Sequence, residues 1–472
     1  MTFVKNSFPL SFRYWKRFQF YLIILETLLE TFPIYISTLP RLFSLVKQIF
    51  ANFEKYFNDK LILGQNSLSQ AASGRPYGWS CFARLASPPS TLEPVAIFII
   101  SCYSSHMENK NTYQAQLFKN RITKRYKELR KWARKNRISC YRLYDRDIPE
   151  VPLSLDVYEF LPSDVTTPLE CAKFLSEQNR RISENDPAIE KEIEERRFAV
   201  LYLYERPYEK PAEEEEIWFS LMAEEAAKVL NIPLSHIVKK ERKQQKGTNQ
   251  YEKSENDQNY LTGLVQEQGQ LFKLDLQSYL DTGLFFDHRP LRAKVREISG
   301  GKKVLNLFCY TGSFSVYAAS GGAKYIESLD LSNTYLTWAK ENLELNGFKG
   351  KNYVFTKTDV ISWLYEKVKT SSDDEKQKFD LIILDPPTFS NSKSTANVLD
   401  INRDWPELIE QCIKLLSPKG ILYFSTNSTK LIFDAEKIPQ KDKVTVTDIT
   451  EQSIPQDFAG KKPHRCWQIT LK

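Results

Sequence analysis

A catalytic centre is predicted where an apolar strand ends in an acid, two prolines and an aromatic residue. The segment LIILDPPTFS (381–390) ends in Asp385, Pro386 and Pro387, and Phe389 follows two residues later. The prolines stiffen the loop and fix its direction. An exposed aromatic ring beside a pocket offers a face on which a nucleobase can stack. We therefore predict that these four residues form the catalytic centre, although Asp-Pro-Pro is also a common way for a strand to end.

A cofactor turn is predicted in the segment VLNLFCYTGSFS (304–315), where a strand leads through Thr311 and Gly312 into a helix. Open α/β sheets bind cofactors at the carboxyl ends of their strands, beside such turns. The turn has one glycine and lacks the G-x-G-x-x-G pattern, which argues against a dinucleotide pyrophosphate. A methionine-derived cofactor carries no phosphate and needs only a close approach of the backbone. A helix-starting turn without a ligand is the alternative.

Two acids follow the next two predicted strands. Asp330 ends YIESLD, where it could accept hydrogen bonds from the ribose hydroxyls of a nucleoside. Asp359 follows the third strand and could contact an adenine amino group. Aspartate and serine also commonly cap helices, so Asp330, Ser332 or Asp359 could simply start the helix that follows. Both interpretations remain open for each acid.

A further polar cluster lies in YLDTGLFFDHRP (279–290), just before the first strand of this series. Asp287, His288 and Arg289 are consecutive there. For His288 the alternative to a catalytic base is a satisfied surface histidine. For Arg289 the alternative to chemistry is an ion pair with a carboxylate.

The elements that must position these residues alternate between strands and helices from Lys302 onward. Such alternation predicts a parallel, doubly wound α/β sheet. The predicted strands are residues 304–308, 325–330, 353–356, 379–385 and 420–425, and the predicted helices are residues 313–320, 333–346, 360–369 and 403–416. Two last strands, 444–450 and 465–472, have no predicted helix between them.

The preceding region, 107–278, predicts a smaller α+β domain. Residues 118–137 form an amphipathic helix with ten lysines and arginines, and short strands broken by Pro149 and Pro152 follow. Residues 161–216 are acidic and irregular in pattern, and a helix opens at 213–216. A second basic cluster spans 239–247, and 261–276 alternates around Gln268 and Gly269 as a β-hairpin does. We expect a catalytic domain over 279–472.

Residues 1–106 have no assigned role. The apolar stretch 18–40 is interrupted by Glu26 and Glu30, and a carboxylate at a bilayer centre is costly, so we expect no membrane span. Residues 66–96 show no sustained period of 2 or 3.6. One hypothesis is that Met107 is the real start of the protein, and the alternative is an appendage of unknown role.

The composition is that of an ordinary globular protein. The 472 residues are 42% hydrophobic and 26% charged, with a formal net charge of +7 that permits an anionic partner without requiring one. The seven cysteines are scattered without a C-x-x-C pair, so neither zinc nor a disulfide framework is predicted. We expect free thiols, a cytoplasmic location and no metal.

The chain resembles the bacterial 23S ribosomal RNA (guanine-N7)-methyltransferases, which in many bacteria form the C-terminal half of a fused enzyme. The resemblance covers roughly residues 115–472. It rests on LRKWARKNRISCYRLYDRDIPE, ERKQQKGTNQYEK, YLDTGLFFDHRP, LNLFCYTGSFSVYAASGGA, LDPPTFSNSK and DFAGKKPHRCWQIT. The other half of the fused enzyme is missing, so we expect a standalone version. FSTNSTKLIF (424–433) departs from the relatives' pattern, which affects the substrate side of the site.

The resemblance implies a class I S-adenosylmethionine-dependent methyltransferase (Rossmann-like) sheet, preceded by a smaller α+β RNA-binding domain. It implies that S-adenosyl-L-methionine is the cofactor and that 23S ribosomal RNA or a large-subunit precursor is the partner. The implied cofactor contacts are Asp287, Arg289, Asn306, Phe308, Tyr310, Thr311, Gly312, Asp330, Leu331 and Asp359. The basic segments then fit as phosphate contacts, through Lys124, Arg125, Arg130, Lys131, Arg134, Lys239, Lys240, Arg242, Lys243 and Lys246. Solvated helix faces are the alternative for both segments.

The chemistry favours guanine N7 over a ring carbon. Methylation of cytosine C5 needs a cysteine thiolate. The resemblance to the wider superfamily, whose cytosine enzymes carry this cysteine after the fifth strand, implies that the matching positions here are Thr426 and Asn427. Guanine N7 already carries a lone pair, so the protein need only hold the base and the methyl donor in line. Methylation of another RNA base position and a non-catalytic RNA-binding role remain the competing hypotheses.

Overall fold

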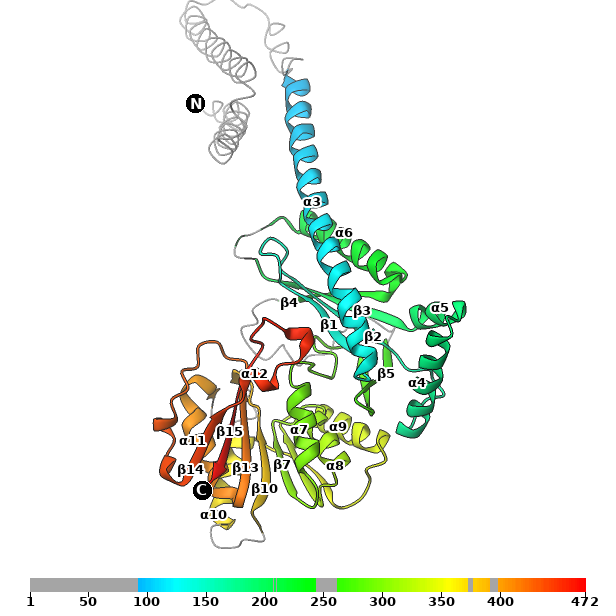
Figure 1. Ribbon diagram of the computed structural model, residues 1–472. Helices are drawn as coiled ribbons and strands as arrows, with labels where there is room; N and C mark the ends of the chain where they lie inside the picture. The colour runs from blue at the N-terminus through cyan, green and yellow to red at the C-terminus, as the bar shows by residue number, and fades with distance from the viewer. Residues whose placement is uncertain (1–91, 207, 209, 243–260, 372–376, 391–397) are drawn as a thin grey trace, which may run out of the picture. The chain divides into compact units, whose positions relative to one another are not determined.

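The computed structural model describes residues 92–472 except 207, 209, 243–260, 372–376 and 391–397 (Figure 1). The apolar stretch 18–40, Lys243 and Lys246 lie outside the described residues. Residues 99–472 form one of two units of the chain. Within the described ranges, no helix is long and apolar enough to cross a membrane.

A seven-stranded sheet carries the second half of the chain. Six of its strands run in the same direction, and β15 is antiparallel to both of its neighbours. In spatial order the strands are β14 (Val444–Asp448), β15 (Arg465–Leu471), β13 (Leu416–Thr426), β10 (Phe379–Leu384), β7 (Lys303–Leu307), β8 (Tyr325–Asp330) and β9 (Tyr353–Lys357). The predicted parallel, doubly wound sheet is confirmed, and the structure adds an antiparallel strand, β15, near one edge. One detail was wrong, because the one-turn helix α12 (Thr450–Ser453) and the 3-10 turn η9 (Gln456–Phe458) lie between the last two strands.

Helices cover both faces of this sheet, which explains why its central strands are apolar without alternation. Successive side chains of a strand point to opposite faces. Val304 of β7 packs with one set of helices, and Leu305 packs with the other. The first set is α7 (Arg289–Ile298) and α8 (Ser313–Ser320), and the second is α10 (Val360–Ser371) and α11 (Ile401–Leu415). Helix α9 (Asn333–Leu345) packs on β8, β9 and β6.

A separate four-stranded sheet precedes it. Its order is β1 (Cys140–Asp145), β2 (Leu153–Glu159), β3 (Arg197–Tyr204) and β4 (Ile237–Arg242), with α6 (Ala212–Leu230) packed on it. The predicted irregular character of 161–216 was wrong. That stretch contains α4 (Pro168–Ser183), α5 (Pro187–Glu195) and the central strand β3. The acidic helices obscured the signal of β3, which is an unbroken apolar run because both of its faces are buried.

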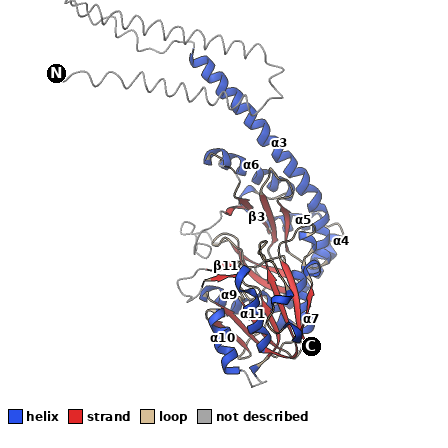
Figure 2. Ribbon diagram, turned by 90° about the vertical axis from the view of Figure 1, so that its left-hand side faces the viewer, coloured by secondary structure: helices blue, strands red, loops and turns tan. Residues whose placement is uncertain are grey.

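Helix α3 (Leu92–Lys135) contains the predicted basic helix but begins well before it and continues through Met107. Its apolar stripe is as predicted, with Phe118, Ile122 and Leu129 buried against the four-stranded sheet and α6. Figure 2 shows α3 as one continuous helix. The helix therefore does not start at the predicted domain boundary.

The predicted hairpin is confirmed as β5 (Thr262–Glu267) and β6 (Gln270–Asp275). Gln268 and Gly269 both have positive φ angles, 51° and 90°, as a two-residue hairpin turn requires. The hairpin shares one apolar core with both sheets, because Val265 and Phe272 pack with Tyr202 of β3 and Tyr317 of α8. The four-stranded sheet and the seven-stranded sheet with its helices are therefore joined by packing, and not only by the chain.

Candidate active site at the carboxyl edge of the sheet

The predicted site residues meet at one edge of the seven-stranded sheet. The turn 308–312 follows β7, Asp330 ends β8, Asp359 follows β9, and Asp385 follows β10. These strands are neighbours and parallel, so their carboxyl ends lie side by side. Ligands of open α/β sheets bind at this edge.

The turn after β7 is tightly wound. Phe308, Tyr310 and Gly312 all have positive φ angles, of 57°, 50° and 73°. The Thr311 hydroxyl donates to the carbonyl of Gly283 at 2.6 Å, which ties this turn to the loop before α7. A Cβ on Gly312 would lie 2.7 Å from the Cβ of Ala339, so the glycine is needed for α9 to pack closely.

Asp330 holds this turn through its carboxylate. One oxygen accepts from the backbone N–H of Tyr310 at 3.0 Å, and the other accepts from that of Ser332 at 2.8 Å. Helix α9 is capped by Ser332, so the capping alternative applies to the serine. Burial raises the pKa of Asp330 despite these donors. Each carboxylate oxygen keeps a second acceptor position, which suits a ribose hydroxyl.

Asp359 and Asn306 have internal roles. Asp359 accepts from the hydroxyl of Ser362 at 2.6 Å and from its N–H at 3.4 Å, at the start of α10, as the capping alternative describes. Asn306 is 2% exposed and donates to the Ser315 hydroxyl at 2.9 Å. That bond joins β7 to α8, so Asn306 stabilises the turn 308–312 that connects them. Leu331 is half-buried beside Asp330.

Asp385 and Phe389 differ sharply in exposure. Asp385 is half-buried, and its Oδ1 accepts from the hydroxyl of Ser425, at the end of β13, at 2.5 Å. Pro386 is buried and Pro387 is half-buried. Phe389 is 57% exposed, although the short strand β11 (Phe389–Ser390) pairs its backbone with β12 (Leu399–Asp400). An exposed aromatic ring that follows a half-buried acid by four residues is suited to stacking on a base.

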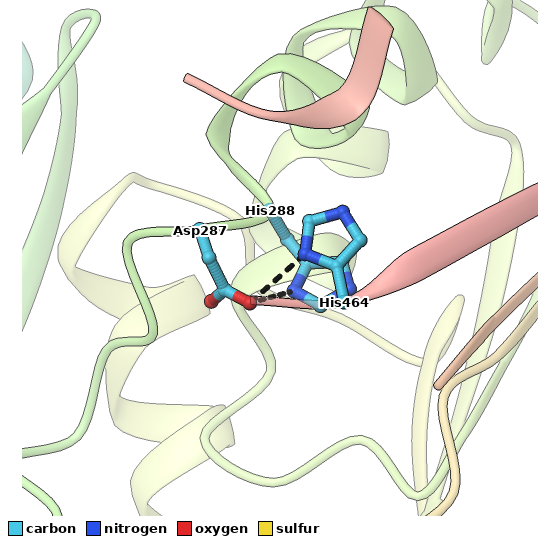
Figure 3. Close-up of side chains that lie close together, drawn as sticks. All are labelled: Asp287, His288 and His464. Carbon is cyan, nitrogen blue, oxygen red and sulfur yellow. Dashed lines mark hydrogen bonds and ion pairs between the residues drawn. The ribbon is translucent and has the colours of Figure 1, made fainter. Parts of the chain in front are cut away.

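Figure 3 shows two stacked histidines, His288 and His464, beside Asp287. The rings of His288 and His464 are 4.0 Å apart and nearly parallel. Oδ2 of Asp287 lies 3.0 Å from Nδ1 of His464 and 3.3 Å from Nδ1 of His288. Nε2 of His288 is buried, has no hydrogen-bond partner among the described residues, and lies 3.7 Å from Oδ1 of Asp385. The surface alternative for His288 was therefore wrong.

His464 and Ser425 were not predicted as site residues. His464 is one of only four histidines in the chain and stands directly before the last strand, which is the signal that could have identified it. Ser425 lies next to Thr426, one of the positions compared for a catalytic cysteine. Because Ser425 ends the fifth predicted strand, the sequence could have placed it at the carboxyl edge of the sheet.

Arg289 is not directed to the cofactor side of the edge. Its guanidinium is 2% exposed and contacts Glu267 at 2.6 Å, Asp457 at 2.9 Å and the carbonyl of Cys140 at 3.0 Å. Arg292 donates to the same Glu267. The implied cofactor contact is corrected for this residue, because protein groups already occupy its donors. The ion-pair alternative is confirmed.

The predicted phosphate contacts divide into two groups. Lys124 and Lys131 are exposed on α3. The others within the described ranges hold partners inside the protein. Arg130 and Arg134 pair with Glu190, Arg125 donates to the carbonyl of Asp457, Lys239 pairs with Glu216, Lys240 donates to the carbonyl of Tyr279, and Arg242 pairs with Asp281.

The edge fits S-adenosylmethionine by the chemistry of its groups. Asp330 supplies a half-buried acceptor, and the turn beside it presents backbone without a phosphate-binding glycine loop. Phe285 is 47% exposed, and its ring lies 5.2 Å from that of Tyr310, which adds an apolar wall beside the turn. These features suit a nucleoside without phosphate.

Comparisons with known proteins agree with this chemistry. The family described as S-adenosylmethionine-dependent methyltransferase matches residues 228–436. Ribosomal RNA large subunit methyltransferase K of Neisseria meningitidis serogroup B is 41% identical over 355 residues, which cover 75% of this chain and 87% of that protein. The methyltransferase K/L of Magnetococcus marinus is 39% identical over 358 residues, which cover 75% of this chain and 43% of that protein. The chain thus matches less than half the length of this K/L relative.

The solved structures support the fold. The crystal structure of SMU.776 complexed with SAH has a TM-score of 0.52 and 21% identity, and the match covers 76% of this chain and 82% of that one. The cofactor of the matched family is S-adenosylmethionine. The chain belongs to the S-adenosylmethionine-dependent methyltransferases, in the family of the ribosomal RNA large subunit methyltransferase K proteins.

Proposed function

We propose that this enzyme methylates N7 of a guanosine in 23S ribosomal RNA or its large-subunit precursor. The observation that carries the proposal is the set of side chains at the end of β13. Thr426 and Asn427 stand at the positions that match the cysteine nucleophile of cytosine-C5 enzymes, and neither is a cysteine. Cys309 lies in the turn after β7, but burial holds the pKa of its thiol well above its usual range. A reaction that needs no protein nucleophile fits these residues.

The chain's own groups have a limited task in such a reaction. Bound S-adenosylmethionine supplies an electrophilic methyl group. The exposed ring of Phe389 stacks on the guanine and sets its plane. The carboxylate of Asp385 lies at the same edge and stabilises the positive charge that develops on the guanine ring as N7 is methylated. The alignment of the guanine with the methyl donor and the charge of Asp385 then accelerate methyl transfer, and no general base is needed.

The exposed lysines of α3 provide the RNA contact in this proposal. Lys124 and Lys131 lie on one side of the helix, seven residues or two turns apart, and are free to meet phosphates. The arginines nearby are held by Glu190 and contribute to folding instead. N7 lies in the deep major groove of A-form RNA, so the target is unpaired or distorted. We expect the enzyme to act in the cytoplasm, where this RNA is assembled.

Mass spectrometry of nucleosides from 23S ribosomal RNA tests the proposal. The RNA is compared between the parent strain, a strain lacking this gene, and a strain complemented with Asp330→Ala. We expect one 7-methylguanosine to be absent without the gene and not restored by the variant. If the 7-methylguanosine content were unchanged and another methylated base were missing, the enzyme would methylate that other base. No change in any base would favour the non-catalytic RNA-binding alternative.

A further inference from the structure

His288 has a buried ring nitrogen that the proposed reaction does not use. The side chain is 6% exposed, and Nε2 has no hydrogen-bond partner within the described residues. A buried polar atom left without a partner costs roughly 1–3 kcal/mol, so its retention needs an explanation. The nearest charged group in front of it is Oδ1 of Asp385, at 3.7 Å.

The surroundings of the ring fix which atom carries a hydrogen. Nδ1 of His288 and Nδ1 of His464 both face Oδ2 of Asp287. The two imidazoles and their hydrogen bonds hold the pKa of Asp287 well below its usual range, although burial opposes this. Asp287 is therefore an acceptor, and both Nδ1 atoms are donors. Nε2 of His288 then presents to Asp385 either a lone pair, which repels the carboxylate, or a proton, which attracts it.

The charges around His288 favour the proton. Burial lowers the pKa of His288, and Arg292 opposes protonation too, but the carboxylates of Asp385 and Asp287 together raise it above its ordinary value. The stacked His464 has a lowered pKa, through burial and the charge of His288, and so remains neutral. One positive ring thus lies between two carboxylates.

We propose that His288 is a positioning residue for methyl transfer: its ring, clamped by Asp287 and His464, directs the Asp385 carboxylate toward the target base. Ser425 is the other donor to that carboxylate, at 2.5 Å. A rotation of Asp385 that closes the 3.7 Å gap gives it two donors from different elements. The inference rests on the proposed function for the role of Asp385, but not for the protonation state of His288.

The sign of the pH dependence follows from the raised pKa. His288 is protonated below its folded-state pKa, which lies above its ordinary value near 6.5. Asp385 is held in place there, and the interaction is lost as pH rises through that pKa. Methyl transfer should therefore decline on the alkaline side, while acidification to about pH 6.5 should leave this interaction intact.

The direct test is ¹⁵N NMR of the histidine rings in the full chain without cofactor. His288→Gln assigns the signal of His288 among the four histidines. We expect His288 to be mainly protonated on both ring nitrogens at pH 6.5, and His464 to be mainly neutral there. A His288 that is mainly neutral at pH 6.5 would overturn the proposal. One equivalent of a bound metal ion, measured by elemental analysis, would also overturn it, because the ring nitrogens would then be ligands.

The functional test compares single-turnover methyl transfer across pH 6–9.5 in three proteins. A misplacement of about 1 Å at a reaction centre costs about 100-fold, so His288→Leu should lower the rate by about 10- to 100-fold without changing S-adenosylmethionine affinity. His288→Gln keeps a neutral donor within reach of Asp385, so we expect most of the rate and no alkaline decline. A normal rate for His288→Leu, or an alkaline decline retained in His288→Gln, would contradict the positioning role. Methylation of another base by the wild type with the same pattern would contradict only the proposed function.

Discussion

Asp287, His288 and Arg289 are consecutive in the chain but belong to two charge clusters, which differ in how completely their hydrogen bonds are satisfied. Arg289 joins Arg292, Glu267 and Asp457 in a buried network in which each guanidinium and carboxylate has hydrogen-bonded partners. Asp287 and His288 belong to the cluster beside Asp385, where one buried nitrogen has no hydrogen bond to the part of the chain that the structure describes. A fully satisfied network stabilises the fold, whereas an incomplete one at a strand end can respond to a substrate. Three adjacent residues of one motif thus divide between stability and chemistry.

The satisfied network joins elements far apart in the sequence. Glu267 comes from β5, Arg289 and Arg292 come from α7, and Asp457 comes from η9. Asp457 also accepts from the backbone N–H of Arg142 in β1. The network therefore ties the four-stranded sheet to the methyltransferase sheet. It explains why the loop before α7 has a fixed position relative to both.

The largest effect should come from breaking the satisfied network. Glu267→Ala removes the carboxylate that pairs with the buried guanidinium groups of Arg289 and Arg292. This loss should lower the free energy of unfolding by about 3–5 kcal/mol. Urea denaturation followed by circular dichroism measures this. Glu177→Ala is the matched control, because Glu177 also binds an arginine but is exposed, and we expect little change there. Equal stability of the two variants would refute the structural role of the network.

Asp330→Ala should act on the cofactor more than on stability. The variant loses the carboxylate proposed to bind the ribose, and hydrogen bonds to a charged group contribute about 1.5–3 kcal/mol each. We expect S-adenosylmethionine affinity, measured by calorimetry, to fall by about 100-fold. The loss in the free energy of unfolding should be smaller than for Glu267→Ala. Unchanged affinity would remove Asp330 from the cofactor site.

Phe389→Ala should affect the RNA substrate without disturbing either charge cluster. The ring is more than half exposed, so its removal should leave the melting temperature unchanged. Base stacking contributes about 1–3 kcal/mol, so kcat/KM for RNA should fall by about 10- to 100-fold with normal cofactor affinity. Phe389→Trp keeps a stacking face and should restore most of the rate. A normal rate for the alanine variant would eliminate the stacking role.

The smallest effect should come from the exposed lysines. Lys124→Glu with Lys131→Glu should weaken RNA binding and reduce the salt dependence of the affinity, by a slope of about 1 for each phosphate that the variant no longer binds. Filter binding over a range of salt concentrations measures both quantities. Lys349→Glu with Lys351→Glu makes the same charge change on exposed residues after α9. If the two double variants behaved alike, net charge alone would explain the binding.

Local patterns were sufficient to predict most of the catalytic half of the fold. The strand 325–330 and the helix 313–320 match the structure to the residue, because strand ends there coincide with turn-forming residues. Strand β3 was missed because a doubly buried strand lacks alternation, and α3 was underestimated in length. Both errors, the missed strand and the short helix, arose because the residue pattern of one segment does not reveal which other segments pack against it.

Pairings between distant residues could not be predicted. Asp287 and His464 are 177 positions apart, and Arg289 and Asp457 are 168 apart. Neither spacing carries a periodic signal, since both depend on how β15 and η9 return to α7. The types of residue at the site were therefore predictable, whereas the division of Asp287, His288 and Arg289 between two clusters required the structure.

Transfer of a labelled methyl group by the purified chain tests the central claim most directly. The full chain is incubated with S-adenosylmethionine labelled in the methyl group and with protein-free 23S ribosomal RNA from the strain lacking the gene. The account predicts that the label enters 7-methylguanosine, at about one methyl group per RNA molecule. Label in a different nucleoside, or no transfer by a protein that binds the cofactor normally, would contradict it.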